Sequence, residues 1–185
     1  KTDGGHEGYK PQPNTYVPPV GPGLWIPTPP AFANAAAPYT GDFRTFTPGL
    51  TSQTQPSTYP IPAYSESAGS DFYNMVNEVY TISQSLSSED ILTVRTWGDI
   101  PGNYNGGAHF TNIATQLIVL KKLKLDEAAL VYAKHGIALN DAAISCFKTK
   151  YQYNLIRPIS YIRNVMGHST WNTVIPTPPH PEFSS

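Results

Sequence analysis

The stretch from residue 126 to residue 149 reads DEAALVYAKHGIALNDAAISCFKT, and its apolar residues occupy nearly every side of a helix. A helix that is hydrophobic all round lies in a protein interior, typically at the centre of a helical bundle. Asp126 is its expected N-cap. Its polar side chains need partners, because burying an unpaired polar group costs about 1–3 kcal/mol; they are His135, Asn140, Asp141 and Ser145. The stretch therefore predicts an all-α fold with this helix at its centre.

The residues before this helix show the helical period three more times. Apolar residues spaced at i, i+3 and i+4 predict an amphipathic helix over 67–85. Ser87 or Ser88 is the predicted cap of a short helix that carries Trp97. The period returns over 108–122, after a loop in which proline and four glycines leave no room for a helix. The expected architecture is therefore a helical bundle.

The first 65 residues have a different composition from the rest. They hold 13 of the 19 prolines and 7 of the 14 glycines, which favours extended chain and turns. A mobile tail is one interpretation. We favour a strap, defined as residues 1–65, whose large side chains insert into a helical body formed by residues 66–185. The expected anchors are Val17, Val20, Leu24, Trp25, Ile26, Phe32, Tyr39, Phe43, Phe46, Tyr59, Ile61 and Tyr64.

The charge balance excludes several classes of partner. There are 12 Lys and Arg residues against 13 Asp and Glu residues, a formal charge of -1. Nucleic acids and anionic membranes attract proteins chiefly through positive charge, so neither is expected to bind. No run of about 18 apolar residues is present, so no membrane span is predicted. The single cysteine, Cys146, excludes an internal disulfide.

A basic motif follows the central helix: Lys150-Tyr-Gln-Tyr-Asn-Leu-Ile-Arg157-Pro158. In a continuous helix, its two cations lie about two turns apart on one face, and Pro158 stops or kinks the helix. Residues 128–181 contain only one carboxylate, Asp141, so the cations would repel each other unless an anion lay between them. An Arg fork and a Lys point charge suit a tetrahedral oxyanion. The alternative is two solvated cations at a helix C-terminus, which the helix dipole favours.

The motif resembles the first signature of the superfamily of vanadium-dependent haloperoxidases and type 2 phosphatidic acid phosphatases. The pattern of that superfamily is K-x6-RP, then P-S-G-H, then S-R-x5-H. The resemblance covers about residues 20 to 185 and is strongest to the soluble bacterial haloperoxidases. It is carried by Leu24-Trp-Ile-Pro-Thr-Pro-Pro30, Asn140-Asp-Ala-Ala-Ile-Ser-Cys-Phe-Lys-Thr-Lys150, Arg157-Pro-Ile-Ser-Tyr-Ile162 and Pro178-Pro-His-Pro-Glu-Phe-Ser-Ser185.

The resemblance implies a helical bundle in which Lys150, Arg157 and Ser185 hold vanadate, with phosphate as the alternative occupant. Ser184 stands where the superfamily usually has Pro. The Gly-His that should follow Ser185 and the S-R-x5-H segment are absent. No metal ligand is therefore expected in this chain, and the vanadium-ligating His is expected beyond residue 185. We expect an N-terminal part that is inactive alone and whose partner is the remainder of the protein, in the same polypeptide or as a separate chain.

His180 is the third expected catalytic residue, with Lys150 and Arg157. It falls where the resemblance implies a halide-side residue, an aromatic in chloroperoxidase-like members and often a His in bromoperoxidase-like ones. It is predicted to relay a proton, and the alternative is a histidine in a proline-rich loop. Phe147 stands where Trp is common. The histidines at 109 and 168 are expected to be structural.

Three functions follow from the resemblance. The first is a haloperoxidase that oxidises a halide with hydrogen peroxide at bound vanadate. The second is an acid phosphatase that hydrolyses phosphomonoesters at the same site. The third is a non-catalytic extracytoplasmic scaffold that keeps the fold. Small-molecule substrates are the expected ligands, a homo-oligomer is compatible with the sequence, and an extracytoplasmic location is expected, because members of this superfamily are often exported.

Overall fold

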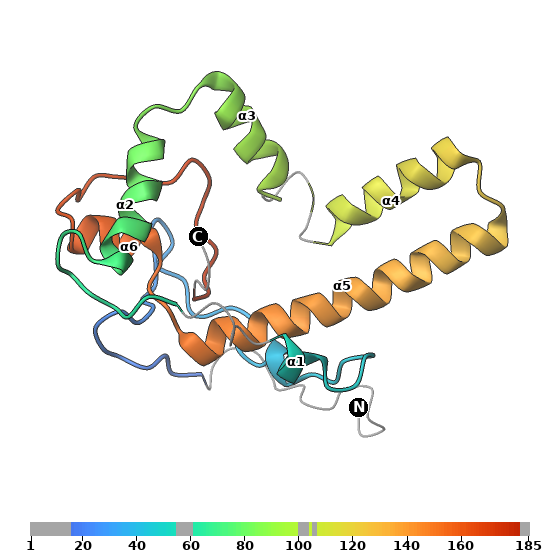
Figure 1. Ribbon diagram of the computed structural model, residues 1–185, viewed down its shortest axis with the longest axis horizontal. Coiled ribbons are helices and arrows are strands. Elements are labelled where there is room, and N and C mark those ends of the chain that lie inside the picture. Colours follow the sequence, from blue (N-terminus) through green and yellow to red (C-terminus); the bar gives the residue numbers. More distant parts are fainter. Residues whose placement is uncertain (1–15, 55–60, 100–103, 105–106, 182–185) are drawn as a thin grey trace.

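The computed structural model describes residues 16–54, 61–99, 104 and 107–181. Within these ranges the chain is helical and forms no strand, so the all-α prediction is confirmed (Figure 1). None of the described helices is long and apolar enough to cross a membrane. The elements are η1 (Thr40–Asp42), α1 (Leu50–Gln53), α2 (Asp71–Ser83), α3 (Ser88–Trp97), α4 (Ala108–Lys121), α5 (Leu125–Tyr153) and α6 (Pro158–Asn164).

A cluster of buried apolar side chains lies where α2 meets α6. The Ser70 hydroxyl caps α2 by accepting a hydrogen bond from the Tyr73 N–H, and this places Phe72 and Val76 on the buried side of the helix. They pack against α6 and the residues just before it; the buried cluster is Phe72, Val76, Ile156, Tyr161 and Ile162. The chain after α6 returns to α2, where the Trp171 indole donates to the Ser83 hydroxyl at 2.8 Å. The segment that follows α5 is therefore anchored in the core.

The predicted N-cap is confirmed for α3 and is wrong for α5. At α3, Ser87 and Asp90 form a reciprocal capping box, as predicted. The prediction that Asp126 caps the central helix is wrong, because α5 begins one residue earlier and Lys124 occupies the N-cap. The Glu127 carboxylate accepts the Lys124 N–H at 2.8 Å. A carboxylate in the first turn thus accepts the N–H of the N-cap residue, which is one half of a capping box.

Helices α4 and α5 form an antiparallel hairpin (Figure 1). Lys122 adopts a left-handed conformation at the end of α4. Polar pairs join the two helices: Thr111 to His135 at 3.0 Å and Thr115 to Tyr132 at 2.9 Å. His135 is therefore a hydrogen-bonded polar group, as predicted, although it lies half-buried between two helices.

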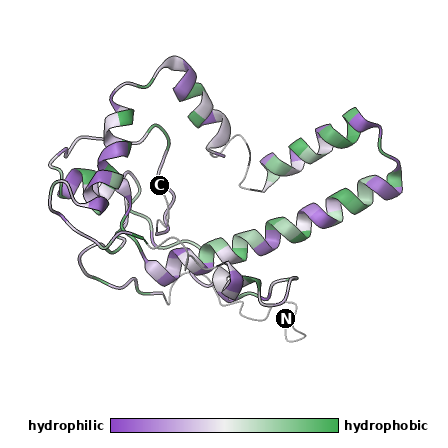
Figure 2. Cartoon of the chain, in the orientation of Figure 1, coloured by the Kyte–Doolittle hydropathy of each residue, from purple (hydrophilic) through white to green (hydrophobic). Residues whose placement is uncertain are grey.

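Helix α5 is not buried all round. Its buried residues, Asp141, Ile144, Ser145 and Thr149, all lie in the C-terminal half. In the N-terminal half Leu125 is 87% exposed and Leu130 is 55% exposed. Apolar stretches of α4 and α5 thus stand open along the hairpin (Figure 2). The prediction of a central helix holds within this chain only for the C-terminal half of α5.

The described part of the strap contacts the body. The predicted insertion of side chains is met in part, since five of the anchors are half-buried: Leu24, Tyr39, Phe43, Ile61 and Tyr64. Trp25 is inserted and only 1% exposed. Five other predicted anchors are exposed: Val17, Val20, Ile26, Phe32 and Phe46. Tyr59 lies outside the described residues. The expectation was wrong for the five exposed anchors because hydrogen bonds of the main chain, described below, hold much of the strap against the body.

Asp141 attaches the strap to the C-terminal half of α5. It is 2% exposed, and its two carboxylate oxygens accept the N–H groups of Phe46 and Thr47, each at 2.8 Å. Burial alone would raise the pKa of Asp141, but these hydrogen bonds lower it below its ordinary value. Asp141 is thus the satisfied polar group that the sequence predicted, and its partner is the strap.

Element η1 approaches α5 very closely at Gly41. A Cβ atom built there would lie 2.5 Å from the Cα of Lys148. Backbone atoms cannot yield to such a contact, so glycine is required. This close approach holds the middle of the strap against the C-terminal half of α5.

Candidate functional site

The basic motif spans the end of one helix and the start of another. Helix α5 includes Lys150 and ends at Tyr153. Asn154 follows in a left-handed conformation, with φ of 46°, and its N–H is bonded to the Lys150 carbonyl oxygen at 2.9 Å. Asn is one of the few residues that adopt this conformation readily at a helix end. The expectation that Lys150 and Arg157 share one helix face is therefore wrong.

Arg157 lies at the N-cap of α6 and Pro158 is the first residue of that helix. The prediction that Pro158 stops a helix is also wrong. Proline has no N–H to lose at a first helical position and its fixed φ suits a helix start, so it begins α6. Arg157 itself is only 6% exposed. Its backbone is extended, and it is fixed between the linker 154–156 and a rigid helix.

Arg157 is hydrogen-bonded to His180, which comes from the C-terminal segment. Its Nε donates to the His180 carbonyl oxygen at 2.7 Å, and a terminal nitrogen lies 2.9 Å from His180 Nδ1. A guanidinium only donates, so Nδ1 accepts and the imidazole proton lies on Nε2. Nδ1 also lies 3.1 Å from the Pro181 carbonyl oxygen.

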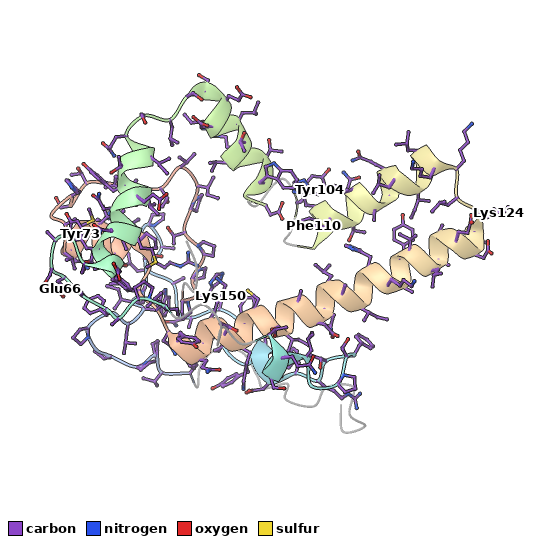
Figure 3. The ribbon with its side chains drawn as sticks, in the orientation of Figure 1. Glu66, Tyr73, Tyr104, Phe110, Lys124 and Lys150 are labelled. Atoms are coloured by element: carbon purple, nitrogen blue, oxygen red, sulfur yellow. The ribbon has the colours of Figure 1, made fainter. Side chains whose placement is uncertain are left out.

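Two aromatic side chains from α5 border this pair. Phe147 contacts the His180 ring edge-on, with centroids 5.4 Å apart, and stacks on Tyr151. Burial raises the pKa of Tyr151 and the positive charge of Arg157 opposes that rise, so the phenol stays protonated at neutral pH. Lys150 is half-buried and extends from the side of α5 that faces the C-terminal segment (Figure 3). The structure thus brings Arg157, His180, Phe147 and Tyr151 together near the end of α5.

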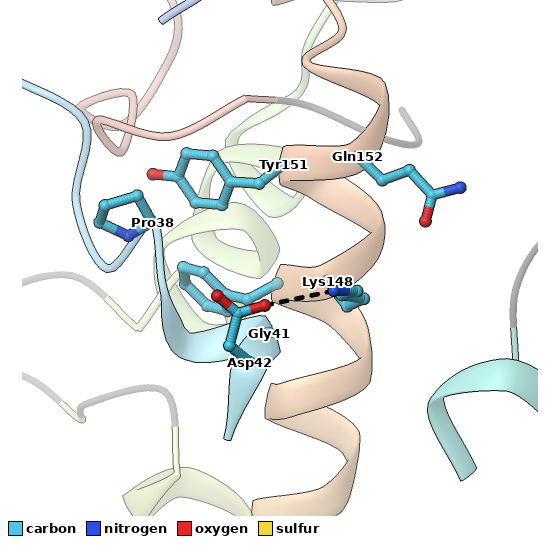
Figure 4. A pocket seen from close by; sticks show the side chains of 7 residues that line it. Pro38, Gly41, Asp42, Lys148, Tyr151 and Gln152 are labelled. Carbon is cyan, nitrogen blue, oxygen red and sulfur yellow. Dashed lines mark hydrogen bonds and ion pairs between the residues drawn. The ribbon is translucent and has the colours of Figure 1, made fainter. Parts of the chain in front are cut away.

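Lys148, two residues before Lys150, belongs to a different surface. It lines a pocket between η1 and α5 and its amine lies 3.2 Å from the Asp42 carboxylate (Figure 4). Both side chains are well exposed, and such surface pairs contribute little stability. Consecutive helix positions point 100° apart, so the two lysines lie on different faces of α5.

Three predicted residues remain: one lies outside the described residues, and two make contacts typical of structural residues. Ser185, expected to bind the oxyanion, lies outside the described residues. His109 bonds to Asp99 at 2.9 Å, and His168 stacks on Tyr80 with ring centroids 3.9 Å apart. Both contacts agree with structural roles. No group of three or more His, Cys, Asp or Glu side chains able to hold a metal ion occurs in the described part of the chain.

Several residues around the site had no sequence signal. The strap reaches the site through main-chain atoms of residues 23–36, and a backbone contact leaves no trace in the choice of side chain. Asn154 was the exception. Asparagine readily adopts the left-handed conformation that ends many helices. Asn154 therefore could have predicted that the helix ends before Arg157.

Comparisons with known proteins agree with this geometry. Residues 130–185 match the family described as the second helical-bundle domain of VCPO. A solved structure, described as the first bacterial vanadium-dependent iodoperoxidase, matches 93% of this chain with a TM-score of 0.82 and 32% identity. The match covers 43% of that protein, so this chain spans less than half of its length. Comparison with curated proteins gives no match.

The fold is therefore the helical fold of vanadium haloperoxidases. The sequence match to the second bundle domain and the structural match over nearly the whole chain agree on the class. Both matches support the vanadium haloperoxidase superfamily, which the basic motif predicted.

Proposed function

We propose that this chain supplies the oxyanion-binding cations of a vanadium-dependent haloperoxidase, whose remaining catalytic residues lie in the rest of the protein. The observation that carries the proposal is Arg157, a nearly buried guanidinium held on His180 at the start of α6. A guanidinium fixed in this way presents a planar fork of donors that matches two oxygens of a tetrahedral oxyanion.

The side chains present fit vanadate or phosphate. Arg157 and Lys150 carry positive charge and only donate hydrogen bonds, and they suit an anion rather than a metal cation. Lys150, Arg157 and Ser185 would hold the oxyanion by charge and hydrogen bonds. Bound vanadate would supply the centre at which hydrogen peroxide is activated to oxidise a halide. Donors fixed in advance around the site stabilise charge as it develops, without reorganisation.

His180 would move the proton in this site. With Nδ1 occupied by Arg157, the proton on Nε2 is the one available for transfer. The ring is held in place by its backbone bond to Arg157 and by the edge contact with Phe147. A neutral imidazole of fixed orientation can donate from Nε2 and recover the proton when the reaction is complete.

The test uses the intact protein that contains this chain. Iodide and bromide oxidation by hydrogen peroxide should require vanadate, with iodide tested first because the solved relative is described as an iodoperoxidase. Hydrolysis of p-nitrophenyl phosphate distinguishes the acid phosphatase alternative. Halide oxidation that ignores added or removed vanadate would overturn the proposal, as would phosphatase activity without peroxidase activity. Recovery of the protein from an extracytoplasmic fraction would test the proposed location.

Arg157→Ala tests the assignment of the site. Truncating one member of a buried hydrogen-bonded charge pair costs at least about 2 kcal/mol, so vanadate affinity should fall at least about 30-fold. The helical circular dichroism should stay nearly unchanged. Lys148→Ala is the matched control, because it removes a nearby lysine whose partner is Asp42 at the surface, and it should bind vanadate like the wild type. Unchanged binding in Arg157→Ala would refute the assignment.

A further inference from the structure

The strap contacts both segments that flank Arg157. One is the linker 154–156, which joins the end of α5 to Arg157, and the other is the segment 179–181, which carries His180. Neither segment belongs to a helix. Their geometry therefore depends on what they contact.

The linker is paired with the strap through main-chain hydrogen bonds. Leu24 and Leu155 form an isolated antiparallel bridge. The Trp25 N–H donates to the Asn154 carbonyl oxygen at 2.7 Å, and the Ile156 N–H donates to the Gly23 carbonyl oxygen at 2.9 Å. These bonds lie on either side of Leu155, so the backbone just before Arg157 has little freedom.

A side-chain contact reinforces this pairing at Asn154. The Tyr16 hydroxyl donates to the Asn154 Oδ1 at 2.7 Å, and the Asn154 amide donates to the Tyr151 carbonyl oxygen. Burial raises the pKa of Tyr16, so the hydroxyl stays protonated and can donate. The Tyr16 ring contacts Tyr151 edge-on with centroids 5.2 Å apart. Tyr16 thus holds the turn at which the chain leaves α5.

The strap fixes the His180 segment through Ala36. The Ala36 N–H donates to the Pro179 carbonyl oxygen at 2.7 Å, and the Ala36 carbonyl oxygen accepts the Tyr151 hydroxyl. Ala36 therefore joins Tyr151 of α5 to Pro179, the residue before His180. The strap from 16 to 36 contacts α5, the linker and the C-terminal segment.

We propose that the strap segment 16–36 sets the placement of Arg157 relative to Lys150, and that Tyr16 and Asn154 are positioning residues for oxyanion binding. The proposal rests on the proposed function, because it concerns the same cations. Two cations from different helices bind one anion well only if the connection between them is fixed beforehand. Tyr16 acts on Arg157 through Asn154 and the linker, without touching the anion.

The test compares Tyr16→Phe and Asn154→Gly in the intact protein. Tyr16→Phe keeps the ring and removes the hydroxyl; Asn154→Gly keeps the left-handed backbone accessible and removes both side-chain bonds. Residues that orient the direct ligands of a site commonly contribute 10-fold or more to its affinity. We expect the dissociation constant for vanadate to rise about 10-fold in each variant, with halide oxidation restored at saturating vanadate and with the thermal midpoint close to that of the wild type.

Tyr64→Phe is the matched control. Its hydroxyl donates to Glu66 at the surface, and its ring remains against Phe72, so vanadate affinity should be unchanged. If the wild type binds neither vanadate nor inorganic phosphate, the proposed function fails. If the wild type binds and Tyr16→Phe and Asn154→Gly bind equally well, the positioning role alone fails. A loss of affinity that follows loss of folding, or that also occurs in Tyr64→Phe, would likewise overturn it.

Discussion

The two halves of α5 carry similar residues and lie in different surroundings. In the C-terminal half, η1 and α1 cover the helix, and the Asp141 carboxylate joins it to the strap. In the N-terminal half the helix contacts α4 through polar pairs, and leucines remain exposed. The apolar pattern of a helix therefore indicates how much of its surface can be buried. Which part is buried depends on the segments that reach it.

The largest expected difference between the two halves comes from a matched pair of truncations. Ile144→Ala removes a side chain that is 2% exposed and should lower the free energy of unfolding by about 2–5 kcal/mol. Leu130→Ala removes an exposed side chain and should change it by about 0.5 kcal/mol or less. Urea denaturation of the 185-residue chain measures both. Equal losses would show that the N-terminal half is buried in solution.

The contact at Gly41 gives the next largest effect. Gly41→Ala places a Cβ against the backbone of Lys148, so η1 must move away from α5. Such overpacking typically costs about 1–3 kcal/mol. Thermal unfolding measures the loss, and Gly136→Ala is the control, because a Cβ there meets nothing within 4 Å. A midpoint for Gly41→Ala like that of the wild type would contradict the close contact.

Acid should release the strap from α5 through Asp141. Since the folded pKa is lowered, the stabilisation is complete above the ordinary Asp pKa of about 3.9 and is lost as the pH falls through the lower folded value. Limited proteolysis of the strap should therefore accelerate below about pH 4. Asp141→Asn should be cleaved faster at neutral pH and lose that acid dependence. A wild-type cleavage rate that is flat through this range would exclude the carboxylate as the attachment.

The smallest effect is expected for charge on the open half of α5. Leu125→Lys places an amine at a position that is already 87% exposed, so the free energy of unfolding of the chain should change by about 0.5 kcal/mol or less. Chemical denaturation checks this value. The same substitution at Ile144 should prevent folding, because it would bury an unpaired charge. A large loss from Leu125→Lys would mean that a contact covers this end of the hairpin.

The sequence predicted the regular parts of this molecule well. The helical period located α2, α4 and most of α5, and the Ser87 cap located α3. The basic motif identified the superfamily, which the comparisons confirm. These features depend on neighbouring residues or on side-chain type, and both can be read from the sequence.

The connections were harder to predict. The left-handed turn at Asn154 divides the basic motif between two helices, and a period of apolar residues cannot show where a polar segment leaves the helix. Aromatic content overestimates the burial of the strap, since Phe32 and Phe46 are exposed. The contact between Arg157 and His180 joins residues 23 positions apart. Only the fold brings such residues together.

The backbone character of the strap contacts has a consequence for divergence among related proteins. Gly23, Trp25, Ala36, Phe46 and Thr47 bond to the body through main-chain atoms, so most of their side chains can be exchanged while the path of the chain is kept. The sequence match begins at residue 130, whereas the structural match covers 93% of the chain. Apart from Leu24–Pro30, which carries part of the sequence resemblance, a strap of this kind can change its sequence faster than its shape, and relatives that keep its path can be recognised by structure where the sequence has diverged.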